Sequence, residues 1–246
     1  MKSDFIFGIH AVLAAIDNDR SNILRVIVDG SRKDKRFSEL AETTRSAGIR
    51  LESADKKTLD KLTSGARHQS VVAEYRPALV HGEDALLDAL SVEGRNWLIL
   101  VLDGVQDPHN LGACLRTADA AGVDAVIVPK DRAVGITPVV RKVAAGAADR
   151  VPFYQVTNLR RTLERLQQQG VWVMGTDDQA ERLYTEIDYA GPVAIVMGAE
   201  GKGLRRLTRE LCDELVVIPM AGSVSSLNVS VATGICLYEA VRQRQA

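Results

Sequence analysis

Six short apolar runs in the later part of the sequence constrain the fold more than any other feature. They alternate with segments of helical character and cover residues 97–103, 124–129, 151–156, 171–176, 193–198 and 214–219. Continuous apolar strands are typical of a parallel sheet covered on both faces, and their alternation with helices indicates an α/β fold. Ligands bind such sheets beyond the carboxyl ends of the strands. We therefore predict an α/β domain over residues 95–246 with its site at those ends.

Residues 1–76 predict a second, smaller α/β unit. The patterns indicate strands over residues 23–29, 49–53 and 70–75, and helices over residues 7–16, 37–48 and 56–64. The stretch 77–94 contains Pro77, Gly82, Gly94, four acids and no base before Gly94, so we predict a linker with a helical turn or more in its middle.

Composition excludes some classes of protein and leaves others open. No run of about 18 apolar residues occurs, so we expect no membrane span. The beginning, "MKSDFIFGIHAV", lacks the layout of a signal peptide. The three cysteines (Cys114, Cys212 and Cys236) are far apart and odd in number, which favours reduced thiols in the cytoplasm. No Cys or His pair has zinc-ligand spacing, so we expect no metal.

The charge distribution gives slight support for an RNA partner. Residues 1–76 contain 14 basic and 11 acidic residues, whereas residues 94–246 contain 17 of each. A mildly basic surface attracts phosphates, although an excess this small also fits an ordinary solvated surface.

Three strand ends carry unusual sequence: "LVLDGVQDPHNLGACLRTADAAG" (100–122), "VMGAEGKGL" (196–204) and "IPMAGSVSSLNVSVATGICLYEAV" (218–241). The second lacks both the spacing of a Walker loop and the third glycine of a dinucleotide fingerprint. It fits either a turn with a solvated Glu200 or a backbone cradle for a ligand other than a nucleotide phosphate.

The first of these stretches predicts a helix with one charged side. Asn110 is a good residue type for its N-cap, and His109 fits a polar turn. The residues Leu111, Cys114, Leu115 and Ala118 fall on one side of the helix. Arg116 falls on the other side between small alanines, which leaves its guanidinium accessible or simply at the surface.

The third stretch predicts a loop followed by a helix. Ser225 or Ser226 would cap a helix that begins near Leu227, whereas Asn228 is a mediocre helix former at that place. The apolar stripe Leu227, Val231, Ile235 and Tyr238 predicts a core face. Gly234 within this helix suggests the close approach of another backbone, in this chain or in a second subunit.

Together, the three stretches resemble the motifs of the SPOUT class of RNA methyltransferases, in its SpoU branch of ribose 2'-O-methyltransferases. They match in order and spacing over some 140 residues. The stretches "GIHAV" (8–12) and "HQSVVA" (68–73) are similar to the substrate-binding domain of that branch. The likeness is strongest to the bacterial enzymes that methylate a guanosine ribose in the peptidyl-transferase loop of 23S rRNA.

The resemblance implies a fold and a site that periodicity alone does not give. The fold would be an α/β sheet closed by a trefoil knot, behind a small N-terminal α/β domain similar to ribosomal protein L30e, and the enzyme would be a homodimer. S-adenosylmethionine would be the cofactor, held largely by backbone at Gly198, Ile218, Met220 and Leu227. The catalytic constellation would be Asn110, Arg116, Glu200, Ser226 and Asn228. The N-terminal domain would hold RNA, with Arg67, His68 and Gln69 as candidates, although these three also fit a solvated turn.

The chemistry of such an enzyme limits the role of Arg116. A ribose 2'-hydroxyl is a weak nucleophile, so the reaction needs alignment with the donor and removal of one proton. A guanidinium has no acceptor site while protonated, and its pKa lies above about 12. We therefore favour contact with a phosphate and stabilisation of the developing alkoxide over general-base catalysis.

Three other functions are compatible with parts of the sequence. A sister group methylates a tRNA guanosine ribose but usually has a basic C-terminal extension, where this sequence reads "VRQRQA". Another relative methylates a 23S adenosine and confers thiostrepton resistance. A non-catalytic RNA-binding protein on the same fold is disfavoured by the complete set of five catalytic candidates.

Overall fold

The computed structural model describes residues 4–31, 34–76, 80–92, 94–201 and 203–245. The chain divides into two compact units, residues 1–78 and 79–246, which are considered separately below. Residues 77–79 and 93 of the expected linker lie outside the described residues.

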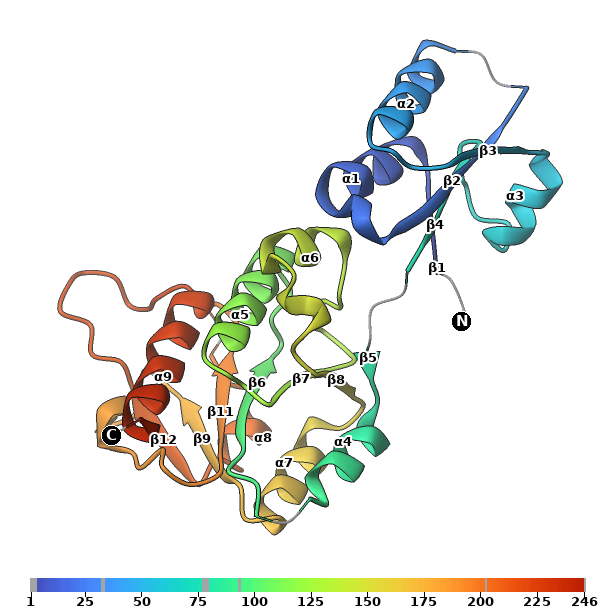
Figure 1. Ribbon diagram of the computed structural model, residues 1–246. Helices are drawn as coiled ribbons and strands as arrows, with labels where there is room; N and C mark the ends of the chain where they lie inside the picture. The colour runs from blue at the N-terminus through green and yellow to red at the C-terminus, as the bar shows by residue number, and fades with distance from the viewer. Residues whose placement is uncertain (1–3, 32–33, 77–79, 93, 202, 246) are drawn as a thin grey trace. The chain divides into compact units, whose positions relative to one another are not determined.

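The first unit is a mixed sheet with helices on both faces (Figure 1). Its strands are β1 (Asp4–Phe7), β2 (Ile23–Asp29), β3 (Leu51–Ala54) and β4 (Val71–Tyr75), and its helices are α1 (Ile9–Asp19), α2 (Lys35–Ser46) and α3 (Lys56–Leu62). The strand order is β1-β4-β2-β3, in which β4 is antiparallel to β1 and β2, and β2 is parallel to β3. Helices α1 and α2 cover one face, whereas Leu59 of α3 packs with Ile27 and Val72 on the other.

The second unit is built on a parallel sheet, as the apolar runs predict. Its strands are β5 (Val80–His81), β6 (Leu98–Asp103), β7 (Ala125–Pro129), β8 (Phe153–Val156), β9 (Trp172–Thr176), β10 (Arg182–Leu183), β11 (Val193–Gly198) and β12 (Glu214–Val217). Its helices are α4 (Glu83–Leu90), α5 (Pro108–Ala120), α6 (Pro138–Ala144), α7 (Leu159–Gln168), α8 (Arg206–Arg209) and α9 (Val229–Arg244).

The strand order β10-β12-β9-β11-β6-β7-β8-β5 places β6 and β11 side by side near the middle of the sheet. They run parallel from the pair Leu98 and Val193 to the pair Asp103 and Gly198, so two of the unusual stretches begin at neighbouring strand ends. Strand β12 lies beyond β9, but the helix that follows it, α9, packs against α5. The chain therefore returns across the sheet after β12.

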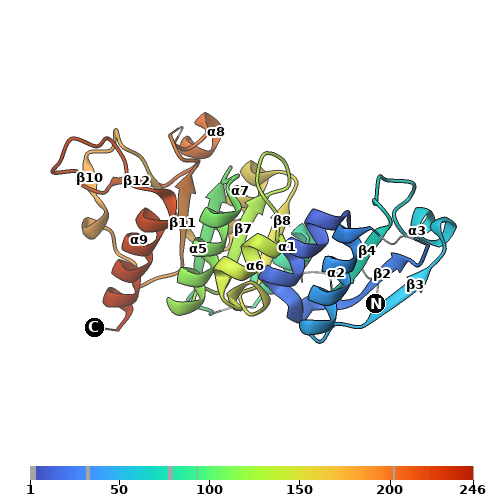
Figure 2. The ribbon, with the colours of Figure 1, turned by 90° about the horizontal axis from the view of Figure 1, so that it is seen from above.

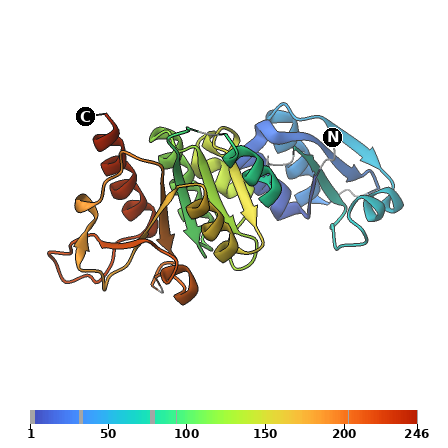
Figure 3. The same ribbon diagram turned by 90° about the horizontal axis from the view of Figure 1, so that it is seen from below.

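Both faces of this sheet are covered, as Figures 2 and 3 show from opposite directions. Alternate side chains of β6 separate the two cores: Leu98, Leu100 and Leu102 face α5, α6 and α9, whereas Ile99 and Val101 face α4 and α7. The predicted buried side of α5 (Leu111, Cys114, Leu115 and Ala118) is confirmed, because none of these side chains is exposed.

Part of the expected linker has regular structure in the second unit. The pair Val80 and His81 forms β5, which pairs with β8, and α4 follows at once. Leu86 and Leu90 of α4 are buried in the same core as Val156 and Leu163. The helical turn or more that was expected in the middle of this stretch is therefore confirmed, as a short amphipathic helix whose buried leucines are four residues apart.

The expected core stripe of the last helix is wrong at two positions. Val231 and Tyr238 are 51% and 52% exposed, whereas the buried side of α9 contains Thr233, Cys236, Leu237 and Ala240. The other two expected residues are only half-buried, and one of them, Leu227, precedes α9. Gly234 is not required for the packing of α5 against α9, since a Cβ there would lie 3.8 Å from the Thr117 methyl carbon, an ordinary van der Waals distance.

Arg244, in the last turn of α9, binds backbone carbonyls at the opposite end of the sheet from the site. Its guanidinium donates to the carbonyl oxygens of Asn96 at 3.1 Å, Trp97 at 2.8 Å, Tyr189 at 2.9 Å and Gly191 at 2.7 Å. These residues precede β6 and β11, so one side chain joins the starts of the two central strands. Within the described residues, no helix is both long and apolar enough to cross a membrane.

Candidate functional site

The turn between β6 and α5 presents Asn110 at the carboxyl edge of the sheet. Gly104 turns the chain with a φ of 92°, and Asp107 caps α5 by accepting a hydrogen bond from the His109 backbone N–H at 2.8 Å. Pro108 then occupies the first helical position, where it lacks only an N–H that would have no partner. The expectation that Asn110 caps this helix is therefore wrong. Asn110 lies within the first turn, 8% exposed, and its side chain is free for other contacts.

The glycine-rich stretch after β11 forms a tight loop that presents Glu200. The backbones of Ala199 and Gly203 exchange two hydrogen bonds, of 3.1 and 2.9 Å, across the loop. Gly198 is required at its base, because a Cβ there would lie 2.2 Å from the Gly203 carbonyl carbon. Lys202, inside this stretch, lies outside the described residues.

Asn228, rather than a serine, caps the last helix. Its Oδ1 accepts a hydrogen bond from the Ser230 backbone N–H at 2.9 Å. Ser225 and Ser226 instead lie exposed in the loop that precedes Asn228, so the expected serine cap is wrong. Both residue types are good caps, and the sequence alone could not rank them.

A chain of side-chain hydrogen bonds joins the three stretches. Asn110 donates from Nδ2 to Glu200 Oε2 at 3.0 Å, and it accepts at Oδ1 from Asn228 Nδ2 at 2.9 Å. Asn110 therefore uses both ends of its amide to connect Glu200, which is 90 positions later in the sequence, with Asn228, which is 118 positions later. The carboxylate of Glu200 is the acceptor at one end of this chain.

The structure does not bring Arg116 or Ser226 into that hydrogen-bonded chain. Arg116 is exposed on α5, and its guanidinium has no hydrogen bond or ion pair to another described residue. It lies six residues after Asn110, about 9 Å along the helix axis. Ser226 lines a neighbouring cavity instead.

That cavity has a volume of about 790 Å³ and lies between the loops that follow β9, β11 and β12. The four residues expected to contact a cofactor (Gly198, Ile218, Met220 and Leu227) all line it. Sequence reasoning missed residues 176–179, which line it from the end of β9. The polar run "TDDQ" directly after an apolar strand was the signal that could have identified them.

A second cavity, of about 330 Å³, adjoins the first. The two share Ala199, Glu200, Gly203, Leu204 and Val229, so the glycine loop is a common wall. Polar side chains line the second cavity: Asp103, Gln106, Asp107, Asn110, Arg132 and Arg205. Two adjoining spaces therefore lie on either side of the glycine loop, and two ligands could be held next to each other there.

The first unit places its three RNA candidates differently. Arg67 and Gln69 are exposed, and Gln69 Oε1 accepts a hydrogen bond from the Ile9 backbone N–H at 3.2 Å. This bond joins the stretches "GIHAV" and "HQSVVA". His68 is only 5% exposed; its Nε2 is 2.9 Å from Asp60 Oδ1, and its Nδ1 accepts from the Ser70 N–H at 3.0 Å. His68 therefore organises the turn and has no free ring nitrogen for RNA.

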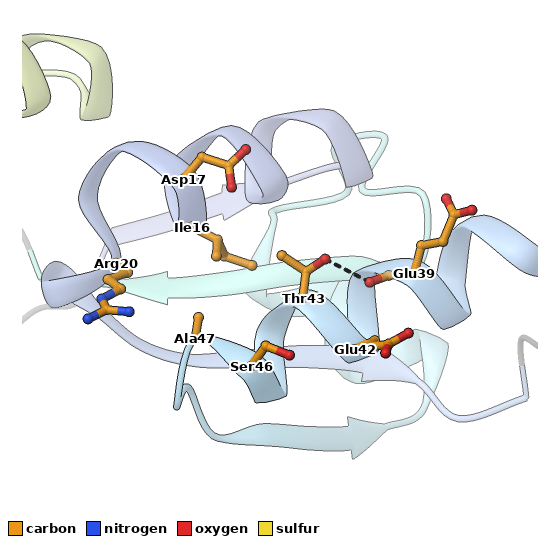
Figure 4. A pocket seen from close by; sticks show the side chains of 8 residues that line it. All are labelled: Ile16, Asp17, Arg20, Glu39, Glu42, Thr43, Ser46 and Ala47. Atoms are coloured by element: carbon orange, nitrogen blue, oxygen red, sulfur yellow. Dashed lines mark hydrogen bonds between the residues drawn. The ribbon is translucent and has the colours of Figure 1, made fainter.

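A third hollow, of about 700 Å³, lies on the first unit between α1 and α2 (Figure 4). Asp17, Glu39 and Glu42 outnumber the one cation, Arg20, in its lining. An anionic lining of this kind repels phosphates, so this hollow is a poor candidate for nucleic acid.

Neither metal nor thiol chemistry finds support in the described part of the chain. His, Cys, Asp and Glu side chains there form no group that could hold a metal ion. Burial raises the pKa of Cys114 to about 11 and those of Cys212 and Cys236 to about 12. These thiols remain protonated at neutral pH and are poor nucleophiles.

Comparison with known proteins agrees with the geometry. Residues 97–238 match the model of the SpoU rRNA Methylase family, and residues 5–80 match the model for RNA 2'-O ribose methyltransferase substrate binding. The 23S rRNA (guanosine-2'-O-)-methyltransferase RlmB of Ralstonia nicotianae is 55% identical over 99% of this chain and 97% of its own. The RlmB of Photobacterium profundum is 54% identical over the full length of both.

Solved structures give the same result. The SpoU methyltransferase AviRb from Streptomyces viridochromogenes, in complex with the cofactor AdoMet, is 27% identical, with a TM-score of 0.64 over 99% of this chain and 91% of its own. An RNA 2'-O ribose methyltransferase is 29% identical, with a TM-score of 0.60 over 98% and 89%. The resemblance drawn from the three motifs is confirmed, and the chain belongs to the SpoU rRNA methylase family.

Proposed function

We propose that this protein transfers a methyl group from S-adenosylmethionine to the ribose 2'-oxygen of a guanosine in 23S rRNA. Relatives named for this reaction are more than 50% identical over the whole chain. The observation that carries the proposal is the hydrogen-bonded chain Glu200–Asn110–Asn228, which lies beside two adjoining cavities. We also propose that this guanosine lies in the peptidyl-transferase loop.

The larger cavity fits the cofactor. Its volume of about 790 Å³ suits a nucleoside-sized ligand. At its wall the missing side chain of Gly198 lets the backbone of Gly203 and Leu204 pack closely, which shapes the loop that borders the cavity. Gly198, Ile218, Met220 and Leu227 would hold the cofactor, with Thr176 and its neighbours. When bound, S-adenosylmethionine supplies a methyl group activated by a positive sulfur.

The residues of the chain would position the ribose and stabilise charge. Asn110 fixes the Glu200 carboxylate and Asn228 at the shared wall, and Ser226 lies on the cofactor side of that wall. Such alignment lowers the barrier by holding the attacking oxygen at the correct distance and angle. Arg116 carries a permanent charge, so we assign it contact with a phosphate and stabilisation of the alkoxide rather than proton removal.

The homodimer and the knot are further parts of the proposal. The exposed side chains Val231 and Tyr238 on α9 would be covered by a second copy of the chain. Arg116 is also exposed, so it could act at the site of the partner protomer. The return of the chain from β12 to α5 supports a threaded C-terminal segment.

The first unit would bind the RNA loop and the second would carry out the transfer. We assign residues 1–76 to substrate binding, 95–246 to catalysis and 77–94 to the connection, whose β5 and α4 pack as part of the catalytic unit. The protein would act in the cytoplasm, where rRNA is made. Arg67 and Gln69 are exposed and would contact RNA, whereas His68 is buried and holds the turn through Asp60 and Ser70.

Single-turnover methylation of a 23S rRNA fragment, at saturating cofactor, tests the proposal. Arg116→Ala should slow transfer by about 100-fold or more, as expected for loss of a group that stabilises developing charge. The affinity for cofactor should not change. Arg160→Ala is the matched control, because Arg160 is an exposed arginine on α7, on the other face of the sheet. Near-normal rates for both Arg116→Lys and Arg116→Ala would exclude a chemical role for Arg116.

The substrate is tested separately. Mapping of ribose methylation in total RNA from a deletion strain should reveal one lost mark in 23S rRNA. A lost mark in tRNA would favour the tRNA alternative, and no lost mark would favour a non-catalytic RNA-binding protein.

A further inference from the structure

Asp103 is a carboxylate that the constellation of five catalytic candidates does not include, although it lies beside them. It is the last residue of β6, its side chain is fully buried, and it lines the smaller cavity. A buried charge is costly unless it is paired and hydrogen-bonded. The structure must therefore supply partners for it.

Arg205 supplies these partners, through both its backbone N–H and its guanidinium. Asp103 Oδ2 accepts from the Arg205 backbone N–H at 3.1 Å, and Asp103 Oδ1 accepts from Arg205 Nε at 2.5 Å. The Arg205 Nη2 also forms an ion pair with Oδ1. One carboxylate thus fixes both the main chain and the side-chain direction of Arg205.

Arg205 closes the loop that carries Glu200. The loop leaves β11 at Gly198, which is the register partner of Asp103, and it reaches Arg205 before α8 begins. Both ends of the loop are therefore anchored at Asp103. Between them the Ala199–Gly203 hydrogen bonds leave Glu200 at the tip, where it accepts from Asn110.

We infer that Asp103 is a positioning residue for methyl transfer, acting through Arg205 on the loop that places Glu200. This inference rests on the function proposed above. Both carboxylate oxygens of Asp103 bind Arg205, so we assign Asp103 a role in positioning and not in contact with the methyl donor or the ribose. Asp103 determines where Glu200 lies at the wall between the two cavities, and a displacement of about 1 Å can cost about 100-fold in rate.

The test uses the variants Asp103→Asn, Glu200→Gln and their combination, in the full chain. Asn keeps the size of Asp but directs an NH₂ group at one of the Arg205 donors, so one of the two clamping contacts is lost. We expect Asp103→Asn to slow single-turnover methylation by about 10- to 100-fold at saturating cofactor and RNA. The double variant should be no slower than Glu200→Gln alone, within about twofold, because both changes act on one group.

Asp124→Asn is the matched control. Asp124 accepts from the Leu98 backbone N–H at 2.8 Å and from Arg95 Nη2 at 2.5 Å, so it makes the same kind of clamp at the opposite end of β6. Its variant should methylate at the wild-type rate. Equal loss of rate in Asp124→Asn and Asp103→Asn would mean that weakening the sheet is sufficient, and the inference would be wrong.

Two other outcomes also overturn the inference. One is a wild-type rate for Asp103→Asn, and the other is a double variant whose loss equals the product of the single losses. If Asp103→Asn does not fold, Arg205→Lys decides, since it keeps the backbone clamp and a positive charge. We expect it to lose less than tenfold and to lose nothing further when combined with Glu200→Gln. Inactive wild-type protein would refute the proposed function instead, so the two failures are distinguishable.

Discussion

Replacing Gly198 with alanine should displace the loop that both cavities share. An ideal Cβ at this position would lie 2.2 Å from the Gly203 carbonyl carbon and 2.5 Å from both the Gly203 oxygen and the Leu204 nitrogen. Non-bonded carbon atoms approach to about 3.5 Å, so the overlap exceeds about 1 Å. All three obstructing atoms belong to the backbone and cannot rotate away. The loop itself must move.

The size of the effect follows from this overlap. Overpacking of this kind costs about 1–3 kcal/mol in the free energy of unfolding. For a unit of more than about 150 residues, this corresponds to a fall of roughly 2–12 °C in the melting temperature. The movement would also strain the Ala199–Gly203 hydrogen bonds and carry Glu200 away from Asn110. We expect methylation to slow by about 100-fold, well beyond what the loss of stability explains.

Thermal unfolding and single-turnover methylation measure the two effects separately. Gly191→Ala is the control, because a Cβ at Gly191 would meet nothing within 4 Å, and it should behave as wild type in both assays. If Gly198→Ala methylates at the wild-type rate with an unchanged melting temperature, the close contact between Gly198 and the loop does not exist in solution. The reasoning about a shared wall would then be wrong.

Three further predictions concern other parts of the chain. Gly112→Ala would place a Cβ 2.6 Å from the Val143 Cβ and should lower the free energy of unfolding by about 1–3 kcal/mol in a chemical denaturation experiment. Three thiols of the native protein should resist alkylation by iodoacetamide at pH 8 (Cys114, Cys212 and Cys236), because burial keeps the pKa of each at about 11 or above and only the thiolate reacts. Rapid modification of any one of them would contradict this. Deletion of residues 1–76 should abolish rRNA methylation and leave cofactor binding nearly intact in calorimetry, whereas loss of both would mean that the units are not separable.

The parallel sheet could be predicted because its strands are buried on both faces and therefore read as continuous apolar runs. The caps of α6 and α7 follow from residue type: Thr137, directly before Pro138, accepts from the Val140 N–H, and Asn158 accepts from the Arg161 N–H. Strand β1 was missed because it has only four residues, and because the helix predicted over residues 7–16 ran across Gly8, which separates β1 from α1. Strand β5 has only two residues and is defined by its partner β8, which no local pattern reveals.

The candidate site was predictable as a set of strand ends but not as a set of contacts. Asp107 and Asn110 are equally good caps by type, and Pro108 decides for Asp107, since proline is favoured at the first helical position. That choice frees the Asn110 side chain to join Glu200 and Asn228. The burial of His68 could not be predicted, because a buried histidine and an exposed one look alike in sequence. Its partner Asp60 is eight residues away, and only the folded turn brings the two together.

The contacts of Arg244 have a consequence for the order of events during folding. This side chain binds the carbonyl oxygen of Asn96 across a separation of 148 residues. While a ribosome makes the chain from its beginning, the start of β6 emerges long before the side chain that completes its hydrogen bonding. Contacts of such long range slow folding, because a large loop must close before they form. The carbonyl oxygens that precede the two central strands therefore gain Arg244 as a hydrogen-bond partner only after the last helix has been synthesised and docked.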